Sequence, residues 1–177
     1  MLVCISISSP ACTPTFNWRE FRSPDGFVVL LPGRPQTVVR DTPLADTAVQ
    51  LSMTSTGIGG TLFAVGSARL PRSLSDDAAQ RQRALGSLRD ALVRNVNGKI
   101  VKTSPATLPT SPGNARQVVA AEAIEAAGSD AKGRAVRLAA RLFIVDDRLF
   151  QVVALGVEGE IPPDALDTFF ASFRLIQ

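Results

Sequence analysis

The side chains that most often carry out chemistry are scarce in this sequence. Histidine is absent from all 177 residues, which removes the commonest general base and the commonest metal ligand. Cysteine occurs only at Cys4 and Cys12, so the long remainder of the chain has no thiol nucleophile and no thiolate metal ligand. A serine nucleophile would have to use one of three lysines, Lys99, Lys102 or Lys132. We therefore expect no catalytic residue, no metal site and no cofactor.

The acidic residues have the wrong spacing for acid–base catalysis. Glu122 and Glu125 stand three apart in an extended segment, so they should point to opposite faces of a sheet rather than act as a pair. The pairs Asp76-Asp77 and Asp146-Asp147 fall at a helix start and a turn, where carboxylates are common, and no calcium-loop spacing surrounds them. The glycines of 57–60 connect two predicted strands, whereas a phosphate-binding loop leads into a helix.

Two arginines on one predicted strand, residues 134–145, are candidates for ligand binding. Arg137 and Arg141 lie four apart, so they share one face of the strand. If the preceding hairpin turns immediately after Ser129, Glu122 lies opposite Arg137, and no carboxylate lies opposite Arg141. The structural interpretation is a cross-strand ion pair between Glu122 and Arg137. The functional interpretation is that Arg141 offers its planar set of donors to an anionic ligand or a partner's carboxylate.

The overall charge argues against nucleic acid as a partner. Nineteen basic and sixteen acidic residues leave a net charge of +3, with an isoelectric point near 9.4. The arginines are scattered from Arg19 to Arg174, and no basic cluster interleaves with aromatic residues. We expect the chain to bind no nucleic acid.

The N-terminal segment, residues 1–12, differs in composition from the rest of the chain. It is uncharged, apolar and then small, and it ends at Cys12. It resembles the end of a secretory signal peptide, and residues 9–12 resemble a bacterial lipobox, whose cysteine is lipidated and becomes the mature N-terminus. We expect lipidation of Cys12, a tether at 13–16, and a location on the periplasmic side of a bacterial membrane. A short tail with no such role is the alternative.

Residues 17–177 are expected to form a single domain. Apolar runs bounded by turn residues predict strands at 18–22, 27–31, 38–40, 47–55, 61–70, 99–103, 116–125, 134–145 and 148–157. Apolar residues spaced three and four apart predict helices at 75–97, with Ser75 as N-cap, and at 164–173. One core cluster should join the sheet to the helices through Trp18, Phe27, Val29, Leu88, Leu92, Phe143, Phe150, Phe169 and Phe173.

The last predicted hairpin has a defined register. If Asp146 and Asp147 are its two loop residues, Phe143 lies opposite Phe150. Both faces of strand 134–145 carry apolar side chains, so helices should cover part of each face.

Both ends of this domain resemble bacterial PsbP-like domains. The opening reads W-x-x-F-x-S-P-D-G-F-V-V-L-L-P-G-x-P over residues 18–35. The ending reads D-R-L-F-Q-V-V-A-L-G over 147–156 and F-F-x-S-F-x-L over 169–175. The resemblance implies the α+β fold shared by the photosystem II extrinsic protein PsbP and the Ran-binding Mog proteins, an antiparallel β-sheet sandwiched between helices. The family's metal-binding and Ran-binding residues find no matching motif here, so none is carried over.

These observations predict a non-enzymatic, exported and lipid-anchored envelope protein that acts as a binding or assembly module for an envelope protein or an anionic ligand. One alternative is a soluble structural or accessory subunit of an envelope complex. Another is an enzyme with an unrecognised Asp, Glu or Lys site.

Overall fold

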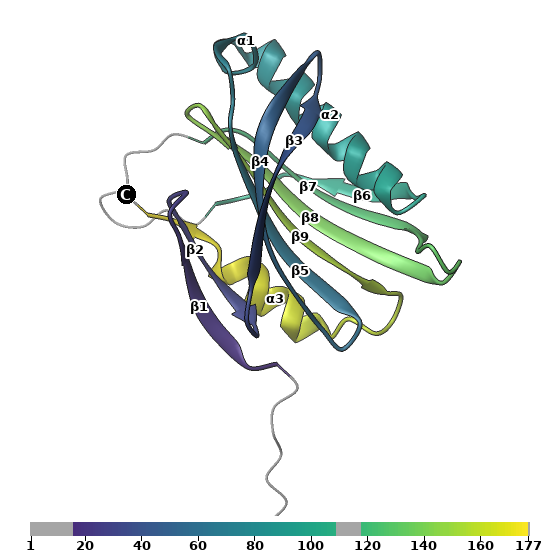
Figure 1. Ribbon diagram of the computed structural model, residues 1–177. Coiled ribbons are helices and arrows are strands. Elements are labelled where there is room, and N and C mark those ends of the chain that lie inside the picture. Colours follow the sequence, from purple (N-terminus) through teal and green to yellow (C-terminus); the bar gives the residue numbers. More distant parts are fainter. Residues whose placement is uncertain (1–15, 109–117, 177) are drawn as a thin grey trace, which may run out of the picture.

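The computed structural model describes residues 16–108 and 118–176, and in this part it contains ten strands and three helices (Figure 1). The helices are α1 (Arg72–Ser75), α2 (Ala78–Asn95) and α3 (Pro163–Ser172). The strands are β1 (Trp18–Ser23), β2 (Phe27–Pro32), β3 (Gln36–Leu44), β4 (Thr47–Ile58), β5 (Thr61–Arg69), β6 (Lys99–Ser104), β7 (Val118–Ser129), β8 (Ala135–Val145), β9 (Arg148–Val157) and β10 (Arg174–Leu175).

The strands form two antiparallel sheets. The larger has seven strands in the order β3-β4-β5-β9-β8-β7-β6, and the smaller has three in the order β1-β2-β10. Two runs of consecutive strands, β3 to β5 and β6 to β9, meet where β5 pairs with β9. Helices α1 and α2 connect the two runs. The fold is therefore α+β with antiparallel sheets and helices, as the sequence predicts.

Helix α2 packs on one face of the larger sheet, mainly over β7 and β8 (Figure 1). Its N-cap is Asp77 rather than the predicted Ser75, because the Asp77 carboxylate accepts a hydrogen bond from the backbone N–H of Gln80 at 2.8 Å. Ser75 instead ends the short helix α1. After the helix, Gly98 allows a close approach to β7, since a Cβ there would lie 2.5 Å from the carbonyl oxygen of Ala127.

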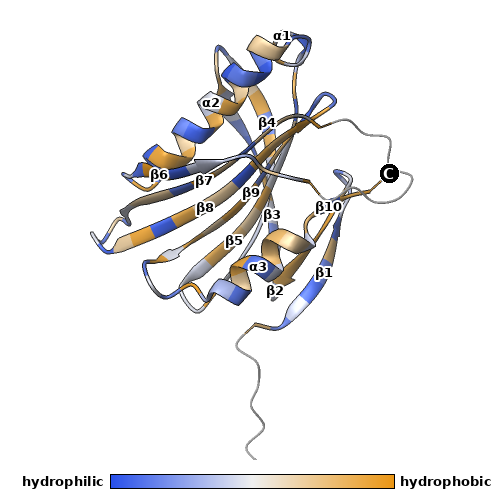
Figure 2. Cartoon of the chain, turned by 180° about the vertical axis from the view of Figure 1, so that it is seen from behind, coloured by the Kyte–Doolittle hydropathy of each residue, from blue (hydrophilic) through white to orange (hydrophobic). Residues whose placement is uncertain are grey.

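Helix α3 and the small sheet lie together on the opposite face (Figures 1 and 2). Their aromatic side chains interlock with those of the large sheet. Phe169 meets Phe63 edge-on at 5.0 Å between ring centroids, and Phe173 stacks on Phe143 at 5.9 Å. Phe173 is 1% exposed, which confirms the predicted docking of the C-terminal helix.

The core consists of two clusters rather than the predicted one. Leu88 and Leu92 belong to an aliphatic cluster under α2. The predicted phenylalanines and Val29 belong to an aromatic cluster under α3 and the small sheet, and Trp18 packs at its margin, partly buried. The seven-stranded sheet separates the clusters, because alternate side chains of each strand point to opposite faces.

Phe16 belongs to the packed structure and not to the tether predicted at 13–16. Its ring stacks on Trp18 at 5.7 Å and meets Phe63 edge-on at 6.1 Å. Its aromatic surface is half-buried against the second cluster, which explains why it is held in place.

The two hairpins around β8 differ in how well the sequence predicts them. Phe143 lies opposite Phe150, as predicted. Between β7 and β8, however, the turn lies later than predicted, because the Asp130 carboxylate accepts hydrogen bonds from the backbone N–H groups of Lys132 and Arg134, each at 2.9 Å. Glu122 consequently lies opposite Leu142 instead of Arg137.

Candidate functional site

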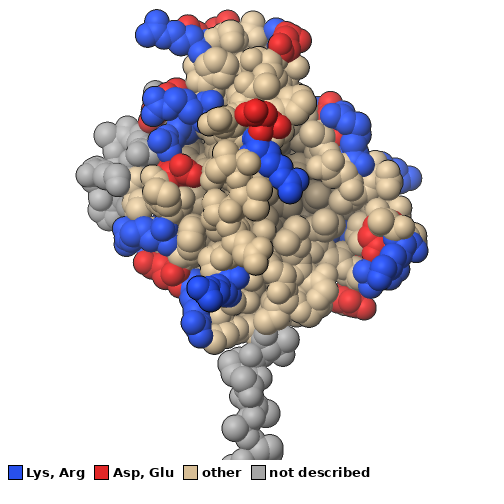
Figure 3. Space-filling model, in the orientation of Figure 1, with Lys and Arg blue, Asp and Glu red and all other residues tan. Residues whose placement is uncertain are grey.

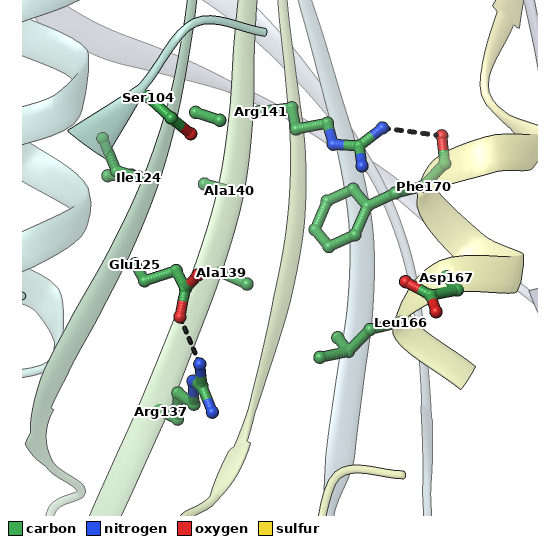
Figure 4. A pocket seen from close by; sticks show the side chains of 11 residues that line it. Ser104, Ile124, Glu125, Arg137, Ala139, Ala140, Arg141, Leu166, Asp167 and Phe170 are labelled. Atoms are coloured by element: carbon green, nitrogen blue, oxygen red, sulfur yellow. Dashed lines mark hydrogen bonds and ion pairs between the residues drawn. The ribbon is translucent and has the colours of Figure 1, made fainter. Parts of the chain in front are cut away.

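A cleft of about 230 Å³ opens between β6, β7 and β8 on one side and α3 on the other (Figure 4). The polar and aromatic side chains that line it are Ser104 of β6, Glu125 of β7, Arg137 and Arg141 of β8, and Asp167 and Phe170 of α3. The structure thus brings both predicted binding arginines into one cleft. We call it the β8–α3 cleft.

Arg137 is neutralised within the cleft by a carboxylate from the neighbouring strand. Its guanidinium donates a hydrogen bond to Glu125 (Figure 4). Lys102 lies 3.7 Å from the same carboxylate. The hydrogen bond from Arg137, assisted by the positive charge of Lys102, lowers the pKa of Glu125. The sequence predicted Glu122 as the partner of Arg137, which is wrong.

Glu122 points to the opposite face of the sheet, where its carboxylate lies 3.4 Å from Arg89 of α2. The predicted divergence of Glu122 and Glu125 is therefore confirmed. It follows from the alternation of side chains along β7, which does not depend on the register with β8.

Arg141 has a different environment from Arg137, although both lie on the same face of β8. Its guanidinium carbon lies 4.6 Å from the ring centroid of Phe170, in the geometry of a cation–π interaction. Its Nη1 lies 3.4 Å from the carbonyl oxygen of Phe170, a long distance for a hydrogen bond. All sixteen acidic residues lie in the described part of the chain, and Arg141 forms no ion pair with any of them.

Burial lowers the pKa of Arg141, and the nearby negative charge of Asp167 opposes that shift. An arginine remains protonated at neutral pH after such a change. Arg141 therefore presents a half-buried positive charge with hydrogen-bond donors to spare, beside an aromatic ring and the hydroxyl of Ser104. A carboxylate or another planar anion has the geometry to accept two of these hydrogen bonds at once.

Two of the residues that shape the cleft could not be identified from the sequence. Asp167 and Phe170 come from a helix that lies beyond β9 in the chain, and only the docking of α3 places them opposite Arg141. The spacing of apolar residues in α3 placed Phe170 on its buried side, but it did not indicate which strand the ring would meet.

On the face shown in Figure 3, Lys and Arg side chains lie next to Asp and Glu side chains. No helix in residues 16–108 and 118–176 is long and apolar enough to cross a membrane. The same residues contain no cluster of three or more side chains suited to hold a metal ion. Cys12, the predicted lipidation site, lies outside the described residues.

Comparison with known proteins assigns this chain to no family. No protein-family model matches the sequence, and no curated protein matches it significantly. Among solved structures, the protein of unknown function PA94 from Pseudomonas aeruginosa is similar over 85% of this chain and 86% of its own, with 12% sequence identity and a TM-score of 0.38. A likeness at this level carries no information about function.

Proposed function

We propose that this chain is an exported PsbP-like binding module that recognises an anionic group in the β8–α3 cleft and catalyses no reaction. The observation that carries the proposal is the state of Arg141. A partly buried cation costs free energy unless a counter-charge compensates it, and the described carboxylates leave Arg141 without an ion pair. An anion bound beside Phe170 would supply that counter-charge.

Arg137 supports this interpretation as an internal comparison. The two arginines lie on the same face of the same strand, yet Glu125 is already engaged by Arg137 and Lys102. Ion pairs of that kind at a partly exposed surface are common and contribute little to stability. Arg141 is the arginine of the pair whose donors remain available to a ligand or to the carboxylate of a partner protein.

The experiment is an NMR titration of the Arg141 side-chain Nε–H with benzoate, using benzamide as a neutral molecule of the same shape. We expect benzoate to cause saturable shifts at millimolar concentrations and benzamide to cause much smaller ones. Arg141→Gln lacks that Nε–H, so it is followed at the backbone amides of the other cleft residues, which should no longer shift with benzoate. Arg137→Gln should retain the response. Equal responses to the two compounds, or an unchanged benzoate response at other cleft residues in Arg141→Gln, would refute the proposed site.

We further propose that the module acts at the bacterial cell envelope and is held there by lipid on Cys12. The support is the lipobox-like segment before Cys12 and the resemblance to PsbP-like domains over residues 18–35, 147–156 and 169–175. One acyl chain binds a membrane only marginally, so stable anchoring needs the several chains that bacterial lipoproteins carry.

The test of the anchor is a Cys12→Ser variant produced in the native host. We expect the variant to move from the membrane fraction to the soluble fraction, and mass spectrometry of the parent protein to show a lipidated cysteine as the mature N-terminus. Cys4→Ser is the matched control, because Cys4 belongs to the part expected to be removed. Membrane retention of Cys12→Ser would exclude this anchor without affecting the cleft.

A further inference from the structure

A second groove, of about 310 Å³, lies on the face of the seven-stranded sheet that carries α2. Helix α2 covers β7 and β8, and near the C-terminal end of the helix the apolar surface of the sheet continues over β9, β5 and β4. The side chains of this aliphatic groove are chiefly Met53, Leu62, Ala64, Leu92, Val153 and Leu155. Four polar residues, Arg40, Thr42, Asn95 and Gln151, also line it.

One buried side chain in the aliphatic groove has an unmet hydrogen-bonding requirement. Gln151 of β9 is 3% exposed, and its Oε1 has no hydrogen-bond partner among the described residues. Its Nε2 faces the sulfur of Met53, which is a weak acceptor. Buried amides in proteins are almost always satisfied, so an unsatisfied amide among leucines and valines calls for a partner from outside the chain.

The neighbouring strand provides the space that this amide occupies. Gly66 of β5 pairs directly with Gln151, and a Cβ at Gly66 would lie 2.6 Å from both Cγ of Gln151 and the sulfur of Met53. Glycine is disfavoured in the interior of a strand unless something approaches its backbone closely. The absence of a side chain at Gly66 therefore leaves the room that the Gln151 amide occupies.

The pairing of β5 with β9 gives the groove two different ends. Gln151 lies opposite Gly66 at the inner end, Val153 lies opposite Ala64 in the middle, and Leu155 lies opposite Leu62 at the outer end. Leu62 is 39% exposed, so the groove opens to solvent there. Leu155 lies four positions along the strand from Gln151, which corresponds to about 13 Å.

We infer that the aliphatic groove binds a neutral single-chain amphiphile. Its hydrocarbon chain would lie on Val153, Leu155 and Leu62, and its hydroxyl or amide head would donate a hydrogen bond to Oε1 of Gln151. Because Oε1 is covered in this structure, binding requires neighbouring side chains to move aside, and the flexible Met53 that contacts the amide is the first of these. The volume is at the lower end of the range of roughly 300–1,000 Å³ for small-molecule sites.

The environment of Gln151 selects against a charged head group. A carboxylate at the inner end would lose its hydration and gain only the donors of a single amide, which do not compensate a buried charge. Arg40 also lines the groove, but its side chain is exposed to solvent, so it does not provide a buried partner for a charged head group. The groove and the β8–α3 cleft lie on opposite faces of the sheet, so each inference can fail without the other.

The experiment uses the fluorescence of 1-aminoanthracene, a neutral aromatic amine, followed by its displacement by 1-decanol or decanoate. We expect saturable binding with one site per chain, displacement by 1-decanol at micromolar concentrations, and at least 10-fold weaker displacement by decanoate. Gln151→Met keeps an unbranched side chain and removes the amide. It should weaken the binding of 1-decanol by roughly 5- to 10-fold.

Two further variants separate loss of the groove from loss of the fold. Leu62→Arg blocks the open end at an exposed position and should abolish binding of the probe. Val39→Arg adds the same charge on β3 at a position that is 59% exposed and not in the groove, and it should bind as the parent does. Absence of saturable binding in the parent, preference for decanoate, or unchanged 1-decanol affinity in a folded Gln151→Met protein would each overturn the inference.

Discussion

The two faces of the seven-stranded sheet differ in the side chains that cover them and in how completely they are closed. On the α3 face, phenylalanines from the large sheet, the small sheet and α3 meet with ring centroids 5.0 to 6.3 Å apart. On the α2 face, the cluster is aliphatic, and a single long helix rests on part of it. The aromatic face is covered by α3 and the small sheet. The aliphatic face is covered by α2, and the short helix α1 adds only Leu74 to the same cluster.

This difference explains where each face can bind a ligand. At the margin of the aromatic face, Arg141 lies under α3, partly buried and with spare donors. In the open part of the aliphatic face, the Gln151 amide is fully buried and only partly satisfied. In both places an unsatisfied polar group lies where the covering helix ends or leaves a gap. The charge of the first favours an anion, and the neutrality of the second favours an uncharged head group.

The largest expected effect is on the aromatic face. Phe169→Ala should lower the free energy of unfolding by about 3–5 kcal/mol, because it leaves a cavity between α3 and Phe63. Denaturant unfolding followed by circular dichroism measures this change. Leu166→Ala, on the same helix but only partly buried, is the control and should cost less. A loss below about 1 kcal/mol for Phe169→Ala would show that α3 does not close this face.

The second prediction concerns the aliphatic face, where a substitution should raise the free energy of unfolding instead of lowering it. Gln151→Met should raise the free energy of unfolding by about 1–3 kcal/mol, because it removes a buried amide that is not fully hydrogen-bonded. Gln50→Met makes the same change at an exposed position of β4 and should leave stability nearly unaltered. Urea unfolding of both variants provides the comparison. Equal effects at the two positions would show that the amide is satisfied in solution.

The third prediction concerns the start of the helix that covers the aliphatic face. Asp77→Ala should lower the free energy of unfolding by about 1 kcal/mol, because it removes the carboxylate that accepts the backbone N–H of Gln80. The neighbouring Asp76 contributes its backbone N–H to the end of α1, so Asp76→Ala should cost less. Thermal unfolding of the pair tests the cap, and the reverse order of stabilities would contradict it.

The smallest expected effect lies beside the β8–α3 cleft. The pKa of Glu125 is lowered by the hydrogen bond from Arg137, so its contribution to stability is full above the ordinary pKa of a glutamate, about 4.3. It is lost as the pH falls through the lower pKa of the folded state. Glu125→Gln should therefore cost less than about 1 kcal/mol at pH 7, since Arg137 is half exposed.

Unfolding experiments between pH 7 and pH 2.5 test the sign of this effect. The parent and Glu125→Gln proteins should converge in stability at the acid end, once Glu125 is protonated in the folded state as well. Glu20→Gln, at a more exposed carboxylate of β1, is a suitable comparison. A stability difference that grows toward low pH would contradict the assigned ion pair.

Much of the element order was predictable because it depends on short-range chemistry. Alternating or continuous apolar runs and turn residues predict most of the strands, and the two-residue loop at Asp146-Asp147 correctly predicts that Phe143 faces Phe150. The β7–β8 register was not predictable in the same way. The Asp130 carboxylate binds two backbone N–H groups of its own turn and moves the centre of the hairpin toward Lys132. A shift in register changes every cross-strand partner at once.

In the candidate sites, too, some features follow from local sequence and others depend on the tertiary structure. The sequence by itself determined that Arg137 and Arg141 share a face and that Glu122 and Glu125 do not, because side chains alternate along any strand. Only the tertiary structure decided that Glu125 engages Arg137 and that Phe170 covers Arg141. Those contacts join residues on different elements, so they depend on a register and a helix position that no local pattern contains. The pairing of Gln151 with Gly66 is of the same kind, since it joins two strands, β5 and β9, that lie far apart in the sequence.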